Sequence, residues 1–425
     1  MVNPSPHVQH AGRALALLLA INLFNYIDRY ILAAVEPLIA AEFFSATDAN
    51  AMAKTGSLAT AFLVSYMVLA PLFGVLADRV SRWVIIAGGV AVWSLASGWS
   101  GLAGTFAALL ISRIFVGIGE AAYGPAAPTI IADMYPLEKR GRMLAYFYLA
   151  IPVGSALGYV FGGSVGGHFG WRWPFYLVVL PGLVLSAACL LMRDPRAARP
   201  AVSRPKMRMA DALALFRIPS YVLNTAAMTA MTFAIGGISF WVPRYLFADR
   251  AAEFGGAPSL ARINLIFGAI TVVAGLSATL LGGWCGDRLR RTRASAYFIV
   301  SGLAMLLAFP ATVLMLKTPF PAAWFMIFFA EFFLFFNVGP ANAALANVTP
   351  PAVRSTAFAL NILLIHALGD AISPPLIGWI AGQASMNTAF LLVSAMMLLA
   401  SAFWLIGTRY LARDTEAVER ASTAP

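Results

Sequence analysis

Six ionisable side chains lie well inside long apolar stretches of this sequence, away from their ends, where charged groups are rare. They are Asp28, Arg29, Arg113, Glu120, Glu331 and Asp370, with His366 one helical turn before the last. Each such charge costs about 2.5–3.5 kcal/mol in hydrocarbon, so these groups usually face a cavity or a partner and mark the path of a solute or a proton. The first four are the strongest candidates for a binding site.

The first four charges lie at similar depths in a membrane if the two helices that carry them cross it in opposite directions. At 1.5 Å per residue, Asp28 lies about 22 Å from the start of its helix. Arg113 lies about 10 Å from the start of the other helix, and Glu120 about 21 Å. Arg113 and Glu120 are two turns apart and share one face. We expect Asp28, Arg29 and Arg113 at one level, with Glu120 nearer the membrane midplane.

This charge cluster suggests a site that binds an anion and exchanges a proton. Arg29 or Arg113 would hold an anionic headgroup, with Tyr26 close by in the first helix. Asp28 or Glu120 would take up or release a proton, because burial favours the neutral form of a carboxyl group and a nearby Arg favours the charged form. The alternative is a static ion pair that only allows polar groups to survive burial.

The other intramembrane groups are less informative. Glu331 and Asp370 have no charged counterpart in the first half of the chain, so helix capping or packing explains them as simply as function does. His366 fits a packing role better than a proton relay. Seven Phe residues between positions 325 and 336 cover all faces of one helix, so most of them must face lipid or neighbouring helices, and some are candidates to line an apolar pocket for an acyl tail.

The composition excludes a soluble protein. Of 425 residues, 60% are hydrophobic and 11% are charged, whereas soluble domains have about 25% charged residues. The net charge of +11 comes mainly from short loops and does not indicate nucleic-acid binding, because no basic soluble domain would carry it. Cys189 and Cys285 form no metal-spacing cluster and are expected to be buried thiols. The sequence has no nucleotide-binding P-loop and predicts neither a metal nor a cofactor.

Apolar runs long enough to cross a membrane, about 20 residues, recur along nearly the whole chain. We expect twelve helices, at 13–38, 53–77, 83–103, 106–132, 142–166, 171–192, 219–247, 261–284, 294–317, 320–347, 353–381 and 386–410. They divide the chain into an N-terminal bundle at 1–192, a polar linker at 193–218, a C-terminal bundle at 219–410 and a tail at 411–425. The first apolar run lacks a cleavage site and is expected to be a retained helix.

The loop charges predict the orientation. Lys and Arg residues number 21 in the termini and the loops on their side of the membrane, but six in the loops on the other side. By the positive-inside rule, this asymmetry places both termini in the cytoplasm, with the chain in a cell inner membrane.

Two loop patterns occur twice along the chain. The first is Gly74, Asp78, Arg79 and Arg82, repeated as Gly283, Asp287, Arg288 and Arg291 at an offset of 209. The second is Pro136 with Arg140, repeated as Pro350 with Arg354 at an offset of 214. Two matches at nearly equal offsets indicate two related six-helix halves, an arrangement in which the substrate site lies at their interface.

The doubled loop, together with Arg113, Gly117, Gly119 and Glu120, resembles the signature motifs of the major facilitator superfamily. This resemblance covers essentially the whole chain. It implies an all-α transmembrane fold of twelve helices, with two pseudo-symmetric six-helix bundles around a central cavity lined by helices 1 and 4. It also implies cytoplasmic gates that latch the outward-open state, formed by Asp78, Arg79, Arg82, Arg140, Asp287, Arg288, Arg291 and Arg354. Plain anchoring of these loops by their Arg residues is the alternative.

Four segments are similar to the Spinster-type branch of that superfamily. They are NYIDR at 25–29, GIGEAAYGPAAPTIIADMYP at 117–136, GWRWPFY at 170–176 and LGDAISPPLIG at 368–378. That branch includes proteins linked to export of sphingosine-1-phosphate and lysophospholipids. The NYIDR element also resembles the organic anion:cation symporter branch.

We therefore expect a secondary transporter that moves a lysolipid or sphingoid-phosphate-like amphiphile by alternating access. Tyr26, Arg29, Arg113 and Glu120 would bind the substrate, and Asp28 or Glu120 would couple transport to protons. Two other functions stay open: a proton symporter of small organic anions such as sugar acids, and a non-transporting membrane sensor or scaffold. An enzyme is not expected, because the charges form no set of nucleophile, base and orienting group. The expected partners are the substrate, membrane lipids and protons, and the chain is expected to be a monomer.

Overall fold

The computed structural model describes residues 11–195, 213–254, 259–351 and 353–423. Every regular element within these ranges is helical, and twelve helical stretches are long and apolar enough to cross a membrane. Helices suit hydrocarbon because all their backbone hydrogen bonds can be made internally. The chain is an integral membrane protein, and the predicted all-α fold with twelve transmembrane helices is confirmed.

The described residues form two compact units. The first contains α1 (Ala11–Phe43), α2 (Ala51–Arg79), α3 (Arg82–Leu102), α4 (Phe106–Tyr123), α5 (Ala126–Met134), α6 (Leu137–Phe169), α7 (Trp173–Leu177) and α8 (Val179–Leu190). The chain continues with α10 (Pro219–Arg244), η2 (Tyr245–Asp249), η3 (Ala251–Phe254), α11 (Leu260–Arg290), α12 (Ala296–Lys317), α13 (Ala323–Phe336), α14 (Val338–Asn347), α15 (Arg354–Ile365), η4 (His366–Asp370), α16 (Ser373–Gln383) and α17 (Met386–Thr423). These elements form the second unit, except that residues 246–248 and 259–269 group with the first.

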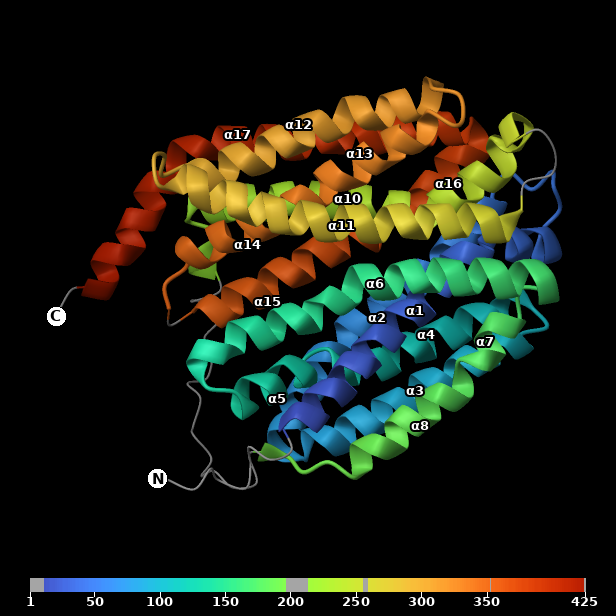
Figure 1. Cartoon of the computed structure of the whole chain (residues 1–425), viewed down its shortest axis with the longest axis horizontal. Coiled ribbons are helices and arrows are strands. Elements are labelled where there is room, and N and C mark those ends of the chain that lie inside the picture. Colours follow the sequence, from blue (N-terminus) through green and yellow to red (C-terminus); the bar gives the residue numbers. More distant parts are fainter. Residues whose placement is uncertain (1–10, 196–212, 255–258, 352, 424–425) are drawn as a thin grey trace. The chain divides into compact units, whose positions relative to one another are not determined.

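The two units share three of their helix pairings. In the first unit, α1 packs on α6, and α3 packs on both α4 and α8 (Figure 1). In the second unit, α10 packs on α15 and η4, and α12 packs on both α13 and α17. In each unit the first span therefore contacts the fifth, and the third contacts the fourth and the sixth. This shared pairing is the structural counterpart of the repeated loop sequences.

Several spans are interrupted rather than continuous. The fourth span breaks at Gly124 and Pro125, between α4 and α5, where a proline removes a backbone donor. The eleventh passes from α15 through the π-helical turn η4 into α16, whose second and third residues are Pro374 and Pro375. The proline positions predict kinks in both spans. A third break, at Asn337 between α13 and α14, lies just before Gly339 and Pro340 and has the same proline signal.

The close contact between α1 and α6 rests on glycines. Gly154, Gly158 and Gly162 repeat at every fourth position of α6 and face α1. A Cβ atom at Gly158 would lie 2.6 Å from the Ile27 carbonyl oxygen, so the two backbones touch there. Small residues permit this approach between transmembrane helices. Because Ile27 directly precedes Asp28 and Arg29, the glycine contact sets the position of the charge cluster.

Replacing Gly158 with Val should lower the unfolding temperature markedly, because overpacking a tight contact costs about 1–3 kcal/mol. The matched control is Gly104→Val, since a Cβ atom at Gly104 meets nothing within 4 Å. Thermal unfolding of the purified variants in detergent measures the difference. Equal unfolding temperatures would show that the α1–α6 contact is looser than described.

Candidate charge cluster in the first unit

The charges predicted to cluster do come together within the first unit. Asp28 and Arg29 lie on α1, and Arg113 and Glu120 lie on α4. α4 packs against both α2 and α3, which add neighbouring side chains to the cluster. All four charges are placed by the packed interior of the unit rather than by loops, so the helices define their geometry.

Arg29 and Glu120 form an ion pair. The Nε atom of Arg29 donates to Oε2 of Glu120 over 2.7 Å, and Nη2 lies 2.6 Å from the same oxygen. Such charge-assisted hydrogen bonds are roughly twice as strong as neutral ones. The Glu120 side chain is fully buried, whereas 22% of the Arg29 side chain is exposed. Arg29 is therefore held by one carboxylate while keeping part of its surface available to a ligand.

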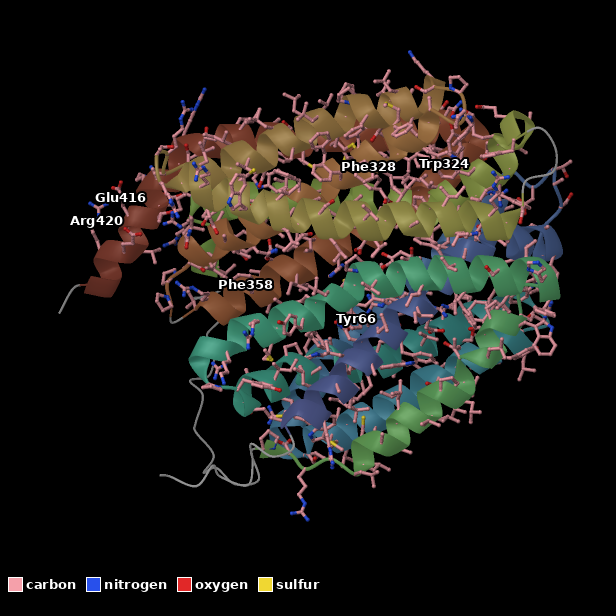
Figure 2. The ribbon with its side chains drawn as sticks, in the orientation of Figure 1. Tyr66, Trp324, Phe328, Phe358, Glu416 and Arg420 are labelled. Atoms are coloured by element: carbon pink, nitrogen blue, oxygen red, sulfur yellow. The ribbon has the colours of Figure 1, made fainter. Side chains whose placement is uncertain are left out.

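Three aromatic rings surround the Arg29 guanidinium. Its central carbon lies 4.8 Å from the ring centroid of Phe62, 5.0 Å from that of Tyr26 and 5.6 Å from that of Tyr66. Figure 2 labels Tyr66, which lies on α2. These distances fall within the range of about 6 Å for cation–π attraction. The rings therefore stabilise a cation at this position.

Phe62 and Tyr66 are site residues that no motif in the sequence predicts. In an apolar helix, an aromatic residue of a binding site has the same composition signal as one that faces lipid. Composition therefore does not predict its role. The spacing of four residues, which places both rings on one helical face, is the signal that could have identified them.

A buried acid and a buried base complete the cluster. Asp28 is fully buried and accepts one hydrogen bond, from Oγ of Ser97 on α3, at 2.6 Å. Arg113 is 1% exposed, and its guanidinium lies 5.8 Å from the Phe62 ring centroid. Among the described residues, neither Oδ1 of Asp28 nor Nε and Nη1 of Arg113 has a hydrogen-bond partner. Buried polar groups are rarely left unpaired, and here two groups of opposite charge both keep unused hydrogen-bonding atoms.

In the second unit, Glu331 and the pair of His366 and Asp370 occupy separate places. Glu331 on α13 is 3% exposed and accepts a hydrogen bond from Thr271 at 3.2 Å. Nδ1 of His366 lies 3.0 Å from each carboxylate oxygen of Asp370 within the π-helical turn η4. π-helical turns are frequent at functional sites. Both arrangements remain candidates for a role in transport.

The Phe-rich helix α13 presents rings on several faces. Phe325 and Phe329 are 65% and 42% exposed. Phe328, labelled in Figure 2, stacks on Phe332 with ring centroids 5.9 Å apart. The exposed rings are available to lipid, and an acyl-tail pocket on this helix stays a prediction.

The two copies of the repeated loop have different surroundings. Arg82 in the first copy is 2% exposed and forms ion pairs with Asp133, at 2.7 Å, and with Asp194, at 2.6 Å. The backbone N–H of Arg82 also donates to Asp194. Its counterpart in the second copy, Arg291, is exposed. The side chain of Asp78 lies outside the described residues, and Arg79 is exposed.

The other predicted gate residues make local contacts. Asp287 accepts a hydrogen bond from the Tyr297 hydroxyl at 2.8 Å, and Arg288 lies over the Trp284 ring, 5.8 Å from its centroid. The guanidinium of Arg354 donates to the Thr349 carbonyl oxygen at 3.3 Å, and Arg140 is half-buried. The gate function of these residues stays a prediction.

The cysteines and the acidic groups give no indication of a metal centre. Cys189 is buried, as predicted, whereas Cys285 is half-buried, and both are free thiols. Within the part of the chain that the structure describes, no three His, Cys, Asp or Glu side chains gather in a way that could hold a metal ion.

Comparisons with known proteins agree with the motifs. The family model of the Major Facilitator Superfamily matches residues 18–369. Protein spinster homolog 1 of Homo sapiens is 40% identical over 395 residues, covering 88% of this chain and 73% of that protein. Protein spinster of Drosophila melanogaster is 35% identical over 370 residues, covering 85% of this chain and 60% of that protein.

A solved structure shares the fold. The crystal structure of a bacterial homologue of the human lysosomal transporter Spinster, in an inward-facing and occupied conformation, matches with a TM-score of 0.80 at 22% identity. The match covers 97% of this chain and 99% of that one. The chain therefore belongs to the major facilitator superfamily and, within it, to the Spinster-type transporters. Its fold is the twelve-helix fold of alternating-access transporters.

Proposed function

We propose that this chain is a secondary transporter of an amphiphile with an anionic headgroup, of the lysolipid or sphingoid-phosphate class. The Arg29–Glu120 pair supports the proposal most directly, because a partly exposed guanidinium is held by a buried carboxylate and surrounded by aromatic rings. We place the chain in a cell inner membrane with both termini in the cytoplasm, following the distribution of loop charges.

In the proposed mechanism, the headgroup and Glu120 compete for Arg29. When a phosphate or carboxylate of the substrate binds Arg29, Glu120 loses its cation. A buried carboxylate without a partner is costly, so Glu120 then takes up a proton. Release of the headgroup returns Arg29 to Glu120 and expels the proton. Asp28 and Arg113, with their unused hydrogen-bonding atoms, offer a second pair for the same exchange. Substrate and proton then move in the same direction.

Uptake into proteoliposomes tests the substrate class. Purified protein should take up radiolabelled lysophosphatidate saturably and should not take up glucuronate. Saturable uptake of glucuronate, with no uptake of lysophosphatidate, would instead identify a symporter of small organic anions. Movement of neither solute under any imposed pH or concentration gradient would identify a sensor or scaffold. Protein-free liposomes give the background of spontaneous lysolipid transfer.

Neutralising Glu120 or Asp28 should uncouple transport from protons. In Glu120→Gln and Asp28→Asn, accumulation driven by a pH gradient should fall at least about tenfold, equivalent to about 1.4 kcal/mol, while exchange of substrate for substrate persists in part. A pH-sensitive dye inside the vesicles reports the proton flux.

The matched control for these variants is Glu36→Gln. Glu36 is another fully buried carboxyl on α1, but it accepts a hydrogen bond from Thr55 at 2.6 Å. This control should keep the pH response of the parent protein. Unchanged pH dependence in both Glu120→Gln and Asp28→Asn would refute the coupling mechanism.

A further inference from the structure

A groove lies on the apolar surface of the first unit, between α2 and α3 and over α4. Its volume is about 310 Å³, at the lower end of the roughly 300–1,000 Å³ typical of small-molecule sites. Val84 and Val92 of α3 line it, together with Val80, which follows α2, and Ile118 of α4. This groove contains none of the charges described above.

Two adjacent glycines of α3 create the groove. A Cβ atom at Gly89 would lie 2.5 Å from the Gly119 carbonyl oxygen, so α3 and α4 touch along their backbones at that point. Gly88, the preceding residue, is exposed, and a Cβ atom there would meet nothing within 4 Å. The missing side chain at Gly88 leaves open space on the α3 side of the groove.

The dimensions of the groove suit one acyl chain. Its α3 wall runs from Val84 to Val92, about 12 Å at 1.5 Å per residue, against about 15 Å for the hydrocarbon of one leaflet, half of the roughly 30 Å core. Val84 and Val92 are 51% and 39% exposed, and both lie within a membrane span. Val84 is the third residue of α3, so the groove starts at the end of the span and runs inward.

A positive charge lies beside the end of the groove that is lined by Val80 and Val84. Arg79, the last residue of α2, directly precedes Val80 and is exposed. Basic side chains at the end of a membrane span attract anionic headgroups. The chain thus offers an apolar slot for a tail and a cation for a phosphate at the same end of the first unit.

We propose that this groove binds one acyl chain of an anionic phospholipid, with the lipid phosphate on Arg79. The site is separate from the Arg29–Glu120 pair and does not depend on the transport function proposed above. Through this groove, an anionic lipid of the bilayer would be a bound ligand of α2, α3 and α4.

Native mass spectrometry of the full chain tests the proposal, with dioleoyl phosphatidylglycerol as the probe. Gly88→Leu should reduce retained phosphatidylglycerol about tenfold, the effect of losing roughly two buried methylene contacts. The matched control is Leu95→Phe, which adds volume to an exposed position of α3 outside the groove. This control should bind as the parent does. Val92→Trp fills the other end and should act like Gly88→Leu.

Two outcomes would overturn the groove as a lipid site. One is parental retention of phosphatidylglycerol in both Gly88→Leu and Val92→Trp. The other is an equal loss in the Leu95→Phe control. The proposed contact between the lipid headgroup and Arg79 is tested separately. Arg79→Gln should abolish the preference for binding phosphatidylglycerol over dioleoyl phosphatidylcholine. A preference that survives in Arg79→Gln, or is absent from the parent, would refute the role of Arg79.

Discussion

Replacing Arg29 with Gln should reduce transport of the anionic amphiphile at least about 100-fold, the loss of about 2.7 kcal/mol of binding. The same change should destabilise the first unit by about 3 kcal/mol, since it leaves Glu120 buried without a cation. The lower end of the usual range of about 3–5 kcal/mol applies, because Arg29 is partly exposed. Uptake into proteoliposomes and denaturant unfolding measure the two effects.

A double variant separates the two consequences of losing Arg29. Arg29→Gln combined with Glu120→Gln removes both charges, so most of the lost stability should return. Transport should stay at the level of the single Arg29 variant, because no cation remains at this position to hold the headgroup. If the double variant regained transport, the ion pair would have only a structural role.

Replacing Arg82 with Gln should destabilise the protein by about 3–5 kcal/mol, as expected when one partner of a buried ion pair is removed. Two carboxylates, of Asp133 and Asp194, lose their shared cation in this variant. The matched control is Arg291→Gln at the equivalent position of the repeat. Arg291 is exposed, and its replacement should change stability by less than about 0.5 kcal/mol.

The two variants together show whether the two loop copies contribute differently to stability. A large loss at Arg82 alone would make the first copy a fixed structural anchor of its unit. Equal losses at both positions would contradict the difference in burial described above. Denaturant unfolding of both variants under the same conditions makes the measurement.

Hydropathy predicted the twelve spans because it depends on local composition. The charge cluster was also predictable, since an ionisable residue in hydrocarbon needs a reason to be there. The break at Gly124 and Pro125 follows from the chemistry of proline. These features depend on short stretches of sequence and on the membrane as solvent.

The pairing within the cluster could not be predicted in the same way. Counting residues along straight helices placed Glu120 nearer the midplane than Arg29, yet the two form a direct ion pair. A long Arg side chain bridges such a difference in depth, and helix crossing decides which acid it reaches. Partners on other helices, such as Ser97 with Asp28, also depend on packing that no single segment encodes. The same holds for the acids that bury Arg82.

The end of the last helix could not be predicted from hydropathy. The last helix, α17, continues to Thr423, although the apolar run ends near residue 410. Hydropathy locates the hydrocarbon span, whereas helix propensity carries the helix beyond it through Ala, Arg and Glu residues. Figure 2 labels Glu416 and Arg420 on this polar extension.

Competition between Glu120 and the substrate headgroup for Arg29 is tested most directly by measuring lysophosphatidate affinity in two single variants. Glu120→Gln removes the competitor and should bind lysophosphatidate about tenfold more tightly than the parent, whereas Arg29→Gln should bind at least about 100-fold more weakly. Binding to the purified protein is measured at one pH and salt concentration. Effects of opposite sign are the predicted result. Weaker binding in both variants, or no change in either, would contradict the competition.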